Sequence, residues 1–305
     1  MLDDKLKALW TRISPPQKAA FFGCFLSGYL VHLYVFTNII PNSDGLSRIF
    51  DPQQMTVSGR WFLHFASYFN GFTQMPAVIG LFSVLFLALA AALAVSLLGI
   101  RSRALSALSG ALMAAFPAVG YTFLYLFTAS AYCFAIFLAV LSVSLARRGR
   151  WHWLAGCLLL ACSMGTYQAY VTVAIGLSLL VIFWETLDPS ASFSATLRLG
   201  VRLMLFLAAG AVLYYGILLV FLQVKDLELL SYLGMDAASS GYPFSRLPGL
   251  LLDTYKQVAA FFFLPGSANT FTSGWMAVLD LAALALGGGC FLLCMGQEGL
   301  WRARW

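Results

Sequence analysis

"PAVIGLFSVLFLALAAALAVSLLG", residues 76–99, is a continuous apolar run without a single charged side chain. A helix needs about 20 such residues to cross a hydrocarbon core about 30 Å thick, so this run is long enough for one crossing. Across all 305 residues, 61% are hydrophobic and only 10% are charged, whereas soluble domains carry roughly 25% charged residues. The sequence therefore predicts an integral membrane protein and excludes a soluble globular one.

Comparable apolar runs recur along the chain, and they predict an all-α, polytopic membrane protein with about eight membrane segments. The fifth and sixth segments share one stretch, 153–185, which is long for one crossing and too short for two. The polar sequence "MGTYQAY" (164–170) interrupts it, and backbone that breaks at membrane depth is tolerated only inside protein or beside water. We therefore expect two short helices that form a partial hairpin around a sheltered turn. The predicted segments lie near 19–40, 76–99, 104–127, 129–146, 153–165, 168–185, 199–223 and 276–295.

The basic residues predict the orientation of these segments. With a cytoplasmic N-terminus and eight segments, 13 lysines and arginines fall inside and five fall outside, in agreement with the positive-inside rule. Counting 153–185 as one crossing changes the balance only to 12 against six. The basic clusters at Arg198–Arg202 and in "WRARW" (301–305) favour eight segments, because they are natural anchors at the inner face. Two large loops, 41–75 and 224–275, then face outward.

The first 18 residues differ from the rest of the chain. Residues 1–18 contain no apolar core, so we expect no cleaved signal peptide. Their larger apolar residues lie on one face of a helix, which predicts an amphipathic cytoplasmic segment on the membrane surface. Residues 19–305 are then expected to form a single transmembrane domain. The apolar face consists of Leu2, Leu6, Leu9, Trp10 and Ile13.

Composition also bounds the partners and cofactors. The net charge of +6 comes from clusters at the ends of apolar runs, so it indicates membrane topology and membrane lipid as a partner, not nucleic acid. The six cysteines all lie inside apolar runs, which predicts packing residues without a disulfide or a metal site. We expect no metal and no other cofactor. The cysteines are Cys24, Cys133, Cys157, Cys162, Cys290 and Cys294.

Aspartate, glutamate, lysine and arginine are absent from every predicted span away from its ends, whereas ion-coupled transporters usually need ionisable groups there. They gather instead in the two outer loops, which predicts a site at the outer membrane surface. In the first loop, "NSDGLSRIFDPQQMTVSGRW" (42–61) contains two aspartates and two arginines. The sequence that follows, "RWFLHFASYFNGF" (60–72), has helical spacing of its aromatic residues and predicts an interfacial helix. Its apolar face comprises Trp61, Phe65, Phe69 and Phe72.

Three features resemble the serotype-converting glucosyltransferases that modify bacterial O-antigen. They are an acidic residue early in the first outer loop, "SGRW" (58–61) before the second span, and a "TYQAY" turn (166–170) between two short helices. The likeness covers most of the chain in order and topology. This chain departs from the family pattern at Ser43-Asp44-Gly45, where the family has paired acids after the serine. Relatives also tend to be longer, with further spans.

The resemblance implies a GT-C class enzyme of the bacterial inner membrane, with its site facing the periplasm. The enzyme would move a sugar, with glucose the expected one, from a polyprenyl-phosphate carrier to a lipid-linked or surface polysaccharide, with inversion. Asp44 would deprotonate the acceptor hydroxyl, with Asp51 as a possible partner, and Arg60 with other loop cations would stabilise the departing phosphate. The expected substrate-binding residues are Arg60, Trp61, Tyr167, Gln168, Tyr242, Arg246 and Lys256.

Each of these residues also has a purely structural interpretation. Asp44 and Asp51 precede Gly45 and Pro52 and suit turns, and Arg60 can snorkel to the interface. Tyr167 and Gln168 can satisfy backbone groups of a broken helix, the cations of the second loop can bind lipid headgroups, and His64 and Asp280 favour structural roles. At the level of function, a non-catalytic flippase or a membrane subunit for a lipid-linked sugar is the alternative.

Overall fold

The computed structural model describes residue 7 and residues 10–40, 50–187, 191–230, 244–264 and 273–297. Within these residues the chain is helical and contains no β-strand, only isolated bridges that pair Phe50 with Thr73 and Met55 with Arg60. Six described helices are long and apolar enough to cross a membrane, or seven if one bent pair is counted as a span. The predicted all-α polytopic membrane fold is confirmed, although the sequence predicts about eight membrane segments. The helix Arg150–Thr166, which corresponds to one of those eight, has only 17 residues and is not among the six.

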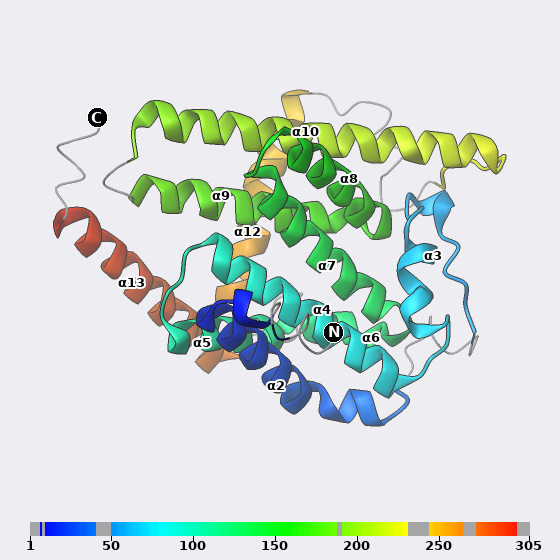
Figure 1. Ribbon diagram of the computed structural model, residues 1–305, viewed down its shortest axis with the longest axis horizontal. Coiled ribbons are helices and arrows are strands. Elements are labelled where there is room, and N and C mark those ends of the chain that lie inside the picture. Colours follow the sequence, from blue (N-terminus) through cyan, green and yellow to red (C-terminus); the bar gives the residue numbers. More distant parts are fainter. Residues whose placement is uncertain are drawn as a thin grey trace. The chain divides into compact units, whose positions relative to one another are not determined.

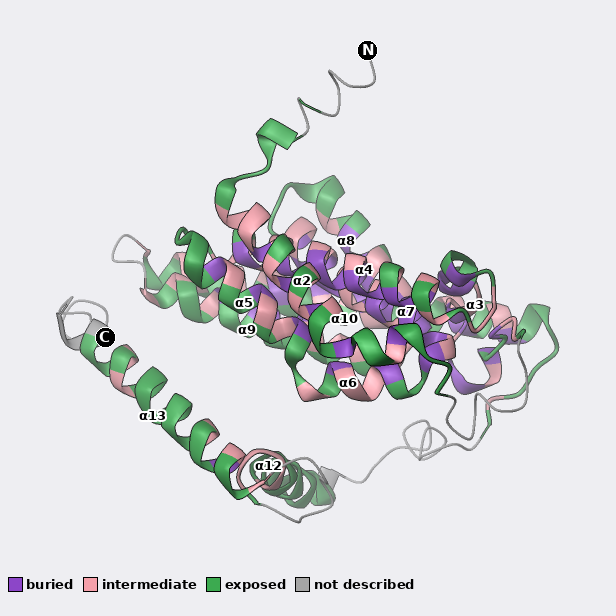
Figure 2. Cartoon of the chain, turned by 90° about the horizontal axis from the view of Figure 1, so that it is seen from below, coloured by how far each residue is buried: buried purple, intermediate pink, exposed green. Residues whose placement is uncertain are grey.

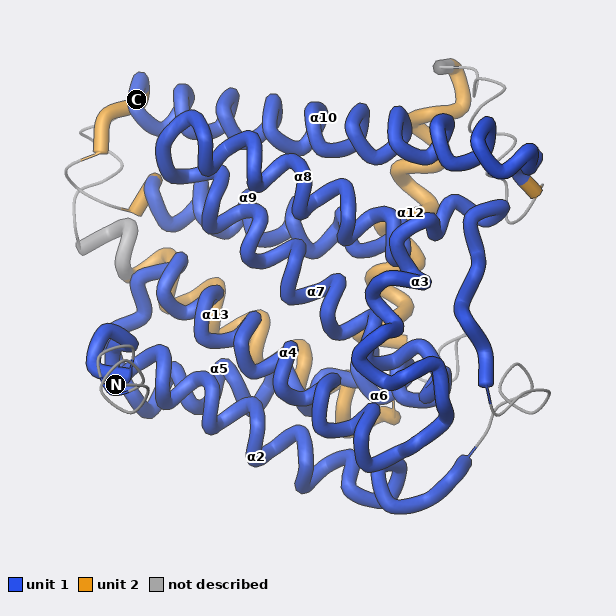
Figure 3. The backbone as a smooth tube through the Cα atoms, turned by 45° about the vertical axis from the view of Figure 1, so that its right-hand side comes forward, with its two compact units in different colours: residues 1–185, 194–229 blue, residues 186–193, 230–305 orange. Residues whose placement is uncertain are grey.

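Backbone contacts divide the chain into two compact units (Figure 3). The first consists of residues 1–185 and 194–229, and the second of residues 186–193 and 230–305. This division concerns contacts alone, and a single transmembrane domain over 19–305 stays a prediction.

Helices α4 and α7 form the centre of the first unit. α4 packs against α2 and α7, α2 also packs against α5, and α7 packs against α8 (Figure 1). Figure 2 shows that buried residues concentrate in α4 and α7. A short helical segment, α3 with the 3₁₀ turn η2, lies at one end of the bundle (Figure 1). The helices are α2 (Pro15–Thr37), α3 (Leu63–Ala66), η2 (Ser67–Asn70), α4 (Pro76–Leu97), α5 (Arg103–Ala115), α6 (Pro117–Leu124), α7 (Leu126–Ala146), α8 (Arg150–Thr166), α9 (Val171–Leu187) and α10 (Phe193–Val224).

Helix α2 begins at Pro15, a few residues before the predicted start of the first span. Ser14 forms a capping box with Gln17: its Oγ accepts from the Gln17 amide at 3.4 Å and its own amide donates to Gln17 Oε1 at 2.9 Å. Proline at the first helical position suits this start because its missing N–H would have no partner there. Polar capping, not hydropathy, therefore sets this boundary.

The third predicted span, 104–127, is bent by 40° between α5 and α6. Phe116 is extended (φ −63°, ψ 134°) and directly precedes Pro117. A proline disfavours helical backbone in the residue before it and removes one helical hydrogen bond. Pro117 thus explains the break.

The broken hairpin predicted over 153–185 is confirmed. α8 ends at Thr166, Tyr167 is extended (φ −158°, ψ 122°), and the 3₁₀ turn η3 (Gln168–Tyr170) leads into α9. The chain reverses direction between α8 and α9 (Figure 1), and Arg147, just before α8, lies 3.9 Å from Glu185 near the end of α9.

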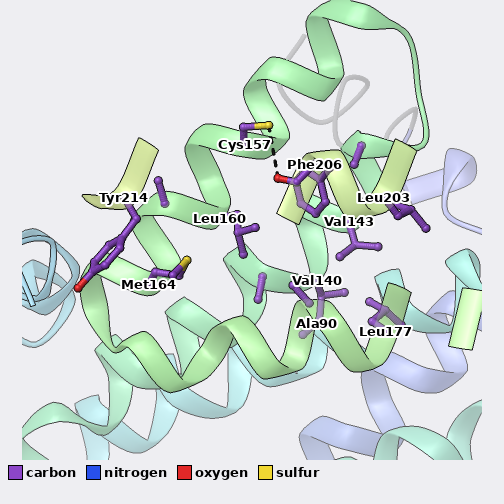
Figure 4. Close-up of a cluster of buried hydrophobic side chains, with 14 of the residues drawn as sticks. Ala90, Val140, Val143, Cys157, Leu160, Met164, Leu177, Leu203, Phe206 and Tyr214 are labelled. Carbon is purple, nitrogen blue, oxygen red and sulfur yellow. Dashed lines mark hydrogen bonds between the residues drawn. The ribbon is translucent and has the colours of Figure 1, made fainter. Parts of the chain in front are cut away.

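Buried side chains of α7, α8, α9 and α10 form a core cluster of the first unit (Figure 4). Leu160, Phe206 and Val143 are fully buried in it, and Cys157 Sγ lies 3.9 Å from the Phe206 carbonyl. Cys24 and Cys133 are buried as well and Cys162 is half-buried, so the packing role predicted for these four cysteines is confirmed. It is wrong for Cys290, which lies on an exposed face of α13; the side chain of Cys294 is outside the described residues.

The second unit contains η4 (Phe244–Arg246), α12 (Leu247–Phe263) and α13 (Gly274–Gln297). α13 corresponds to the last predicted span. α12 lies where the sequence predicts an outer loop, because Asp253, Lys256 and Gln257 interrupt its apolar pattern and hide a helix from a hydropathy window. The stretch 224–275 is therefore not simply a loop.

Candidate functional site

The first outer loop docks onto the broken hairpin at one end of the first unit. The Phe62 amide donates to the Gly165 carbonyl at 2.7 Å, and Gln168 Nε2 donates to the Ser58 carbonyl at 2.7 Å. In a continuous helix the Gly165 carbonyl would accept from Ala169, four residues later. The helix break frees this carbonyl, and the loop satisfies it. "SGRW" and "TYQAY", which are 110 residues apart at the Ser58–Gln168 bond, thereby form one structure.

A chain of hydrogen bonds fixes the backbone just before Arg60. Gln168 Nε2 also donates to the Tyr214 hydroxyl at 3.0 Å, and this hydroxyl donates to the Gly59 carbonyl at 3.0 Å. Gly59 has φ 79°, a left-handed conformation that glycine adopts without steric cost. Two successive carbonyls are thus held by side chains from η3 and α10, which sets the position from which Arg60 projects. In Figure 4, Tyr214 lies at the edge of the core cluster with its hydroxyl turned away from Leu160.

Trp61 anchors the loop in the protein interior. Its side chain is 6% exposed and stacks on Phe221 of α10 at 5.7 Å between ring centroids. A Cβ atom at Gly165 would lie 2.5 Å from Trp61 Cε2, so the indole fits only because residue 165 is glycine. The prediction that Trp61 shares an interfacial face with Phe65 and Phe69 is wrong for Trp61, because its side chain packs in the protein interior against Gly165, next to the helix break. A role of Trp61 in substrate binding stays a prediction.

Arg60 lies among three tyrosines. Its guanidinium carbon is 4.6 Å from the Tyr167 ring centroid, and Nη1 donates to the Tyr132 hydroxyl at 3.2 Å. Tyr132 and Tyr167 stack at 5.3 Å, and Tyr170 meets both rings edge-on at 5.8 and 5.7 Å. Arg60 Nε is buried without a hydrogen-bond partner, and no carboxylate in the described part of the chain pairs with Arg60. We call Arg60, Tyr132, Tyr167 and Tyr170 the arginine–tyrosine cluster.

This geometry joins the two motifs on which the resemblance rests, and residues 33–295, including both motifs, match the family described as glucosyl transferase GtrII. The chain belongs to the GtrII glucosyl transferase family. No curated protein and no solved structure matches it. The predicted kinship with serotype-converting glucosyltransferases is confirmed, and a glucosyl-transfer role follows from it.

The structure gives Asp51 of this GtrII-family chain a turn-forming role. Asp51 Oδ1 accepts from the Gln53 amide at 2.9 Å, and Gln53 is left-handed at φ 56°. His64 Nδ1 lies 2.6 Å from the Pro52 carbonyl, and the His64 ring stacks on Phe72 at 5.0 Å. These contacts account for Asp51 and His64 as structural residues. A catalytic role of Asp51 stays a prediction.

Four other predicted site residues lie apart from this description. Asp44 and Tyr242 are outside the described residues. Arg246 and Lys256 are exposed residues of the second unit, where Lys256 Nζ lies 3.4 Å from Asp253 Oδ1 on the same helix. Their predicted substrate-binding roles stay predictions. Asp280, on α13, is half-exposed.

Sequence reasoning missed three tyrosines of the candidate site: Tyr132, Tyr170 and Tyr214. Tyr132 and Tyr214 lie inside long apolar runs, in α7 and α10, whereas Tyr170 is the last residue of the "TYQAY" motif, where only Tyr167 and Gln168 were predicted as site residues. A tyrosine buried in such a run usually finds a hydrogen-bond partner for its hydroxyl. That signal marks many tyrosines of this chain equally, so it does not single out these three.

Proposed function

We propose that this GtrII-family protein is an inverting, GT-C type glucosyltransferase that takes glucose from a polyprenyl-phosphate carrier. The acceptor is a lipid-linked or surface polysaccharide of the O-antigen type, at the outer face of the bacterial inner membrane. Family membership supports glucosyl transfer. The observation that carries the choice of donor is the arginine–tyrosine cluster, where Arg60 has no carboxylate partner among the described residues.

A phosphate is the anion that best fits such an arginine. The guanidinium fork can donate two parallel hydrogen bonds to phosphate oxygens, and charge-assisted bonds of this kind are about twice as strong as neutral ones. The surrounding rings lower the local dielectric, which strengthens the attraction. The carrier chain of a polyprenyl phosphate would remain in the membrane beside the helices that hold the cluster.

The aromatic rings suit the sugar next to that phosphate. Tyr167 and Tyr132 present stacked faces beside the guanidinium. The hydrogen bonds of Gln168 fix the turn that carries Tyr167, and Tyr132 is held by α7. Aromatic faces pack against the apolar face of a glucose ring. Arg60 would then contact the phosphate while the tyrosine rings hold the glucose, so that the bond between glucose C1 and the phosphate oxygen lies beside the cluster.

In the proposed step, the acceptor hydroxyl oxygen attacks C1 of glucose while the bond from C1 to the phosphate oxygen breaks. The electron pair of that bond leaves with polyprenyl phosphate, whose charge Arg60 stabilises. Asp44 accepts the proton of the attacking hydroxyl as general base. Attack from the face opposite the phosphate inverts the configuration at C1. No cofactor or metal enters this balance, because the phosphate is itself a good leaving group.

The test uses purified full-length protein in lipid nanodiscs with an O-antigen acceptor on its lipid carrier. We expect radiolabelled glucose to move to the acceptor from polyprenyl-phosphate glucose, with inverted configuration in the product. UDP-glucose, offered in parallel, should give no product. Transfer from UDP-glucose but not from the lipid donor would overturn the proposed carrier, and retention of configuration would overturn the proposed mechanism.

A further inference from the structure

A basic hollow of about 620 Å³ lies between the first turns of α8 and the N-terminal part of α10, both in the first unit. Its lining includes three arginines, Arg150, Arg198 and Arg202, and apolar side chains such as Trp153, Leu197 and Leu205. Along α10, Arg198 is separated from Phe221, beside the candidate site, by about 35 Å at about 1.5 Å per residue. The hollow is therefore at the opposite end of α10, which the predicted topology assigns to the other membrane face.

Within the described residues, no carboxylate pairs with any of the three arginines. Among the described residues, the carboxylate near this end of the bundle is that of Glu185, and it lies 3.9 Å from Arg147, outside the hollow. Arg198 Nε donates to the Ser194 carbonyl of its own helix, and Arg202 Nη2 donates to the Arg148 carbonyl. These bonds orient the guanidinium groups without neutralising them. Three like charges around one hollow repel each other and favour an anion between them.

The walls indicate that this anion is attached to a lipid. Leu197 and Leu205 are each 55% exposed and Val201 is 43% exposed, so one side of the hollow is open and apolar. On a membrane-spanning helix such a surface faces acyl chains, whereas Arg198 and Arg202, four residues apart, share one face at the helix end. Trp153 suits the headgroup level, where tryptophan is enriched. A free phosphate would use the arginines but not the apolar wall.

We infer that the hollow binds the headgroup phosphate of an anionic glycerophospholipid, with the lipid's acyl chains against Leu197, Val201 and Leu205. Basic pockets between helix ends hold such headgroups in membrane proteins. By the predicted topology this is the cytoplasmic leaflet. The site is independent of glucosyl transfer and does not rest on the proposed function.

The test compares two double variants of the full-length protein in neutral detergent. Arg150→Gln with Arg198→Gln removes two charges from the hollow, and both side chains are exposed, so folding should survive. Arg101→Gln with Arg103→Gln is the matched control, because it removes two exposed arginines beside α5, outside the hollow. Binding of cardiolipin, of phosphatidylcholine and of inorganic phosphate is measured by native mass spectrometry and by lipid-induced thermal stabilisation.

We expect the wild type and the control to bind cardiolipin equally and the hollow variant to bind it about 25-fold more weakly, since each cation near an anionic surface contributes roughly fivefold in affinity. Phosphatidylcholine and inorganic phosphate should not compete. Equal loss in both double variants would reduce the effect to general surface charge and overturn the site. Competition by inorganic phosphate would overturn the lipid assignment. If the hollow variant unfolds without lipid, Val201→Asp, which places a negative charge in the apolar wall, should weaken cardiolipin binding in its place, and unchanged binding there would also overturn the inference.

Discussion

Arg60 shows how one residue can be specified by its surroundings. Its backbone is fixed by bonds to the Ser58 and Gly59 carbonyls, its neighbour Trp61 is locked in the core, and its guanidinium lies on Tyr167. A long flexible side chain normally loses much rotamer freedom when it binds a ligand. In this protein Arg60 is already held in place before a ligand binds, so its side chain loses less conformational entropy on binding.

Replacement of Arg60 should therefore weaken donor binding as well as turnover. Charge-assisted hydrogen bonds contribute about 1.5–3 kcal/mol, so Arg60→Ala should bind polyprenyl-phosphate glucose about 10- to 100-fold more weakly. Arg60→Lys should restore only part of the affinity, because an ammonium cannot donate as a planar fork. Equilibrium binding to purified protein measures both, with Arg103→Ala, at the first residue of α5, as the control. Unchanged donor binding in Arg60→Ala would remove the phosphate assignment.

Asp44 is the expected base, and its replacement should affect chemistry alone. Asp44→Asn keeps the size of the side chain and removes its basicity, so transfer should fall about 100- to 10,000-fold while protein level and donor binding stay normal. Asp51→Asn is the matched control. Its Oδ1 already accepts a turn hydrogen bond that an amide oxygen can also accept, so near-normal activity is expected. A comparable loss in both variants would mean that the two acids act together, and full activity of Asp44→Asn would refute its role as base.

At the scale of elements, the contact between the first outer loop and the α8–α9 break depends on Gly165. Its missing side chain admits Trp61, and its carbonyl accepts from Phe62. The same residue thus provides the space and the hydrogen bond by which the loop is held.

Gly165→Ala should displace the Trp61 indole from its buried position, because the added Cβ would overlap the ring. Overpacking of this kind costs about 1–3 kcal/mol, and we expect a lower unfolding temperature together with reduced transfer because Arg60 moves with Trp61. Gly176→Ala in α9 is the control, since a Cβ there meets nothing within 4 Å. Alanine is more favourable than glycine inside a helix by about 0.5–1 kcal/mol, so this variant should be at least as stable as the unsubstituted protein. Differential scanning fluorimetry in detergent compares the two. Equal stability of both variants would show that Gly165 does not confine the indole.

For the whole molecule, the arginine–tyrosine cluster and the basic hollow lie near opposite ends of α10, and the predicted topology assigns these ends to opposite membrane faces. α4 has 22 residues, about 33 Å of helix, between the loop that carries Arg60 and the turn that carries Arg101. This length matches one full crossing. The orientation itself, with the loop 50–75 outside, stays a prediction from the positive-inside rule.

Labelling with a membrane-impermeant maleimide tests this orientation in intact cells whose outer membrane is permeabilised. Gln54→Cys, an exposed position of the first loop, should react from outside, and so should Ser239→Cys in the second. Arg101→Cys should react only after lysis, and the unsubstituted chain gives the background from native cysteines. Labelling of Arg101→Cys in intact cells would show that the predicted topology is inverted. Protection of Ser239→Cys alone would show that the second loop does not face outward.

The sequence by itself determined the membrane class, the all-α fold, most of the apolar helices and the broken hairpin. Each of these depends on the composition of one contiguous window: a long apolar run must form a helix in lipid because its backbone has no other partner. The two motifs of the candidate site were also visible, since both are polar sequences in an apolar chain.

Only the tertiary structure decided how those motifs meet. That Phe62 satisfies the Gly165 carbonyl, that Trp61 is buried, and that Tyr132 and Tyr214 complete the surroundings of Arg60 depend on helices packing side by side. These contacts join residues up to 155 positions apart, and no local pattern encodes which of several equivalent tyrosines will face the loop. A hydropathy window sums properties of neighbours in sequence, whereas a site is defined by neighbours in space.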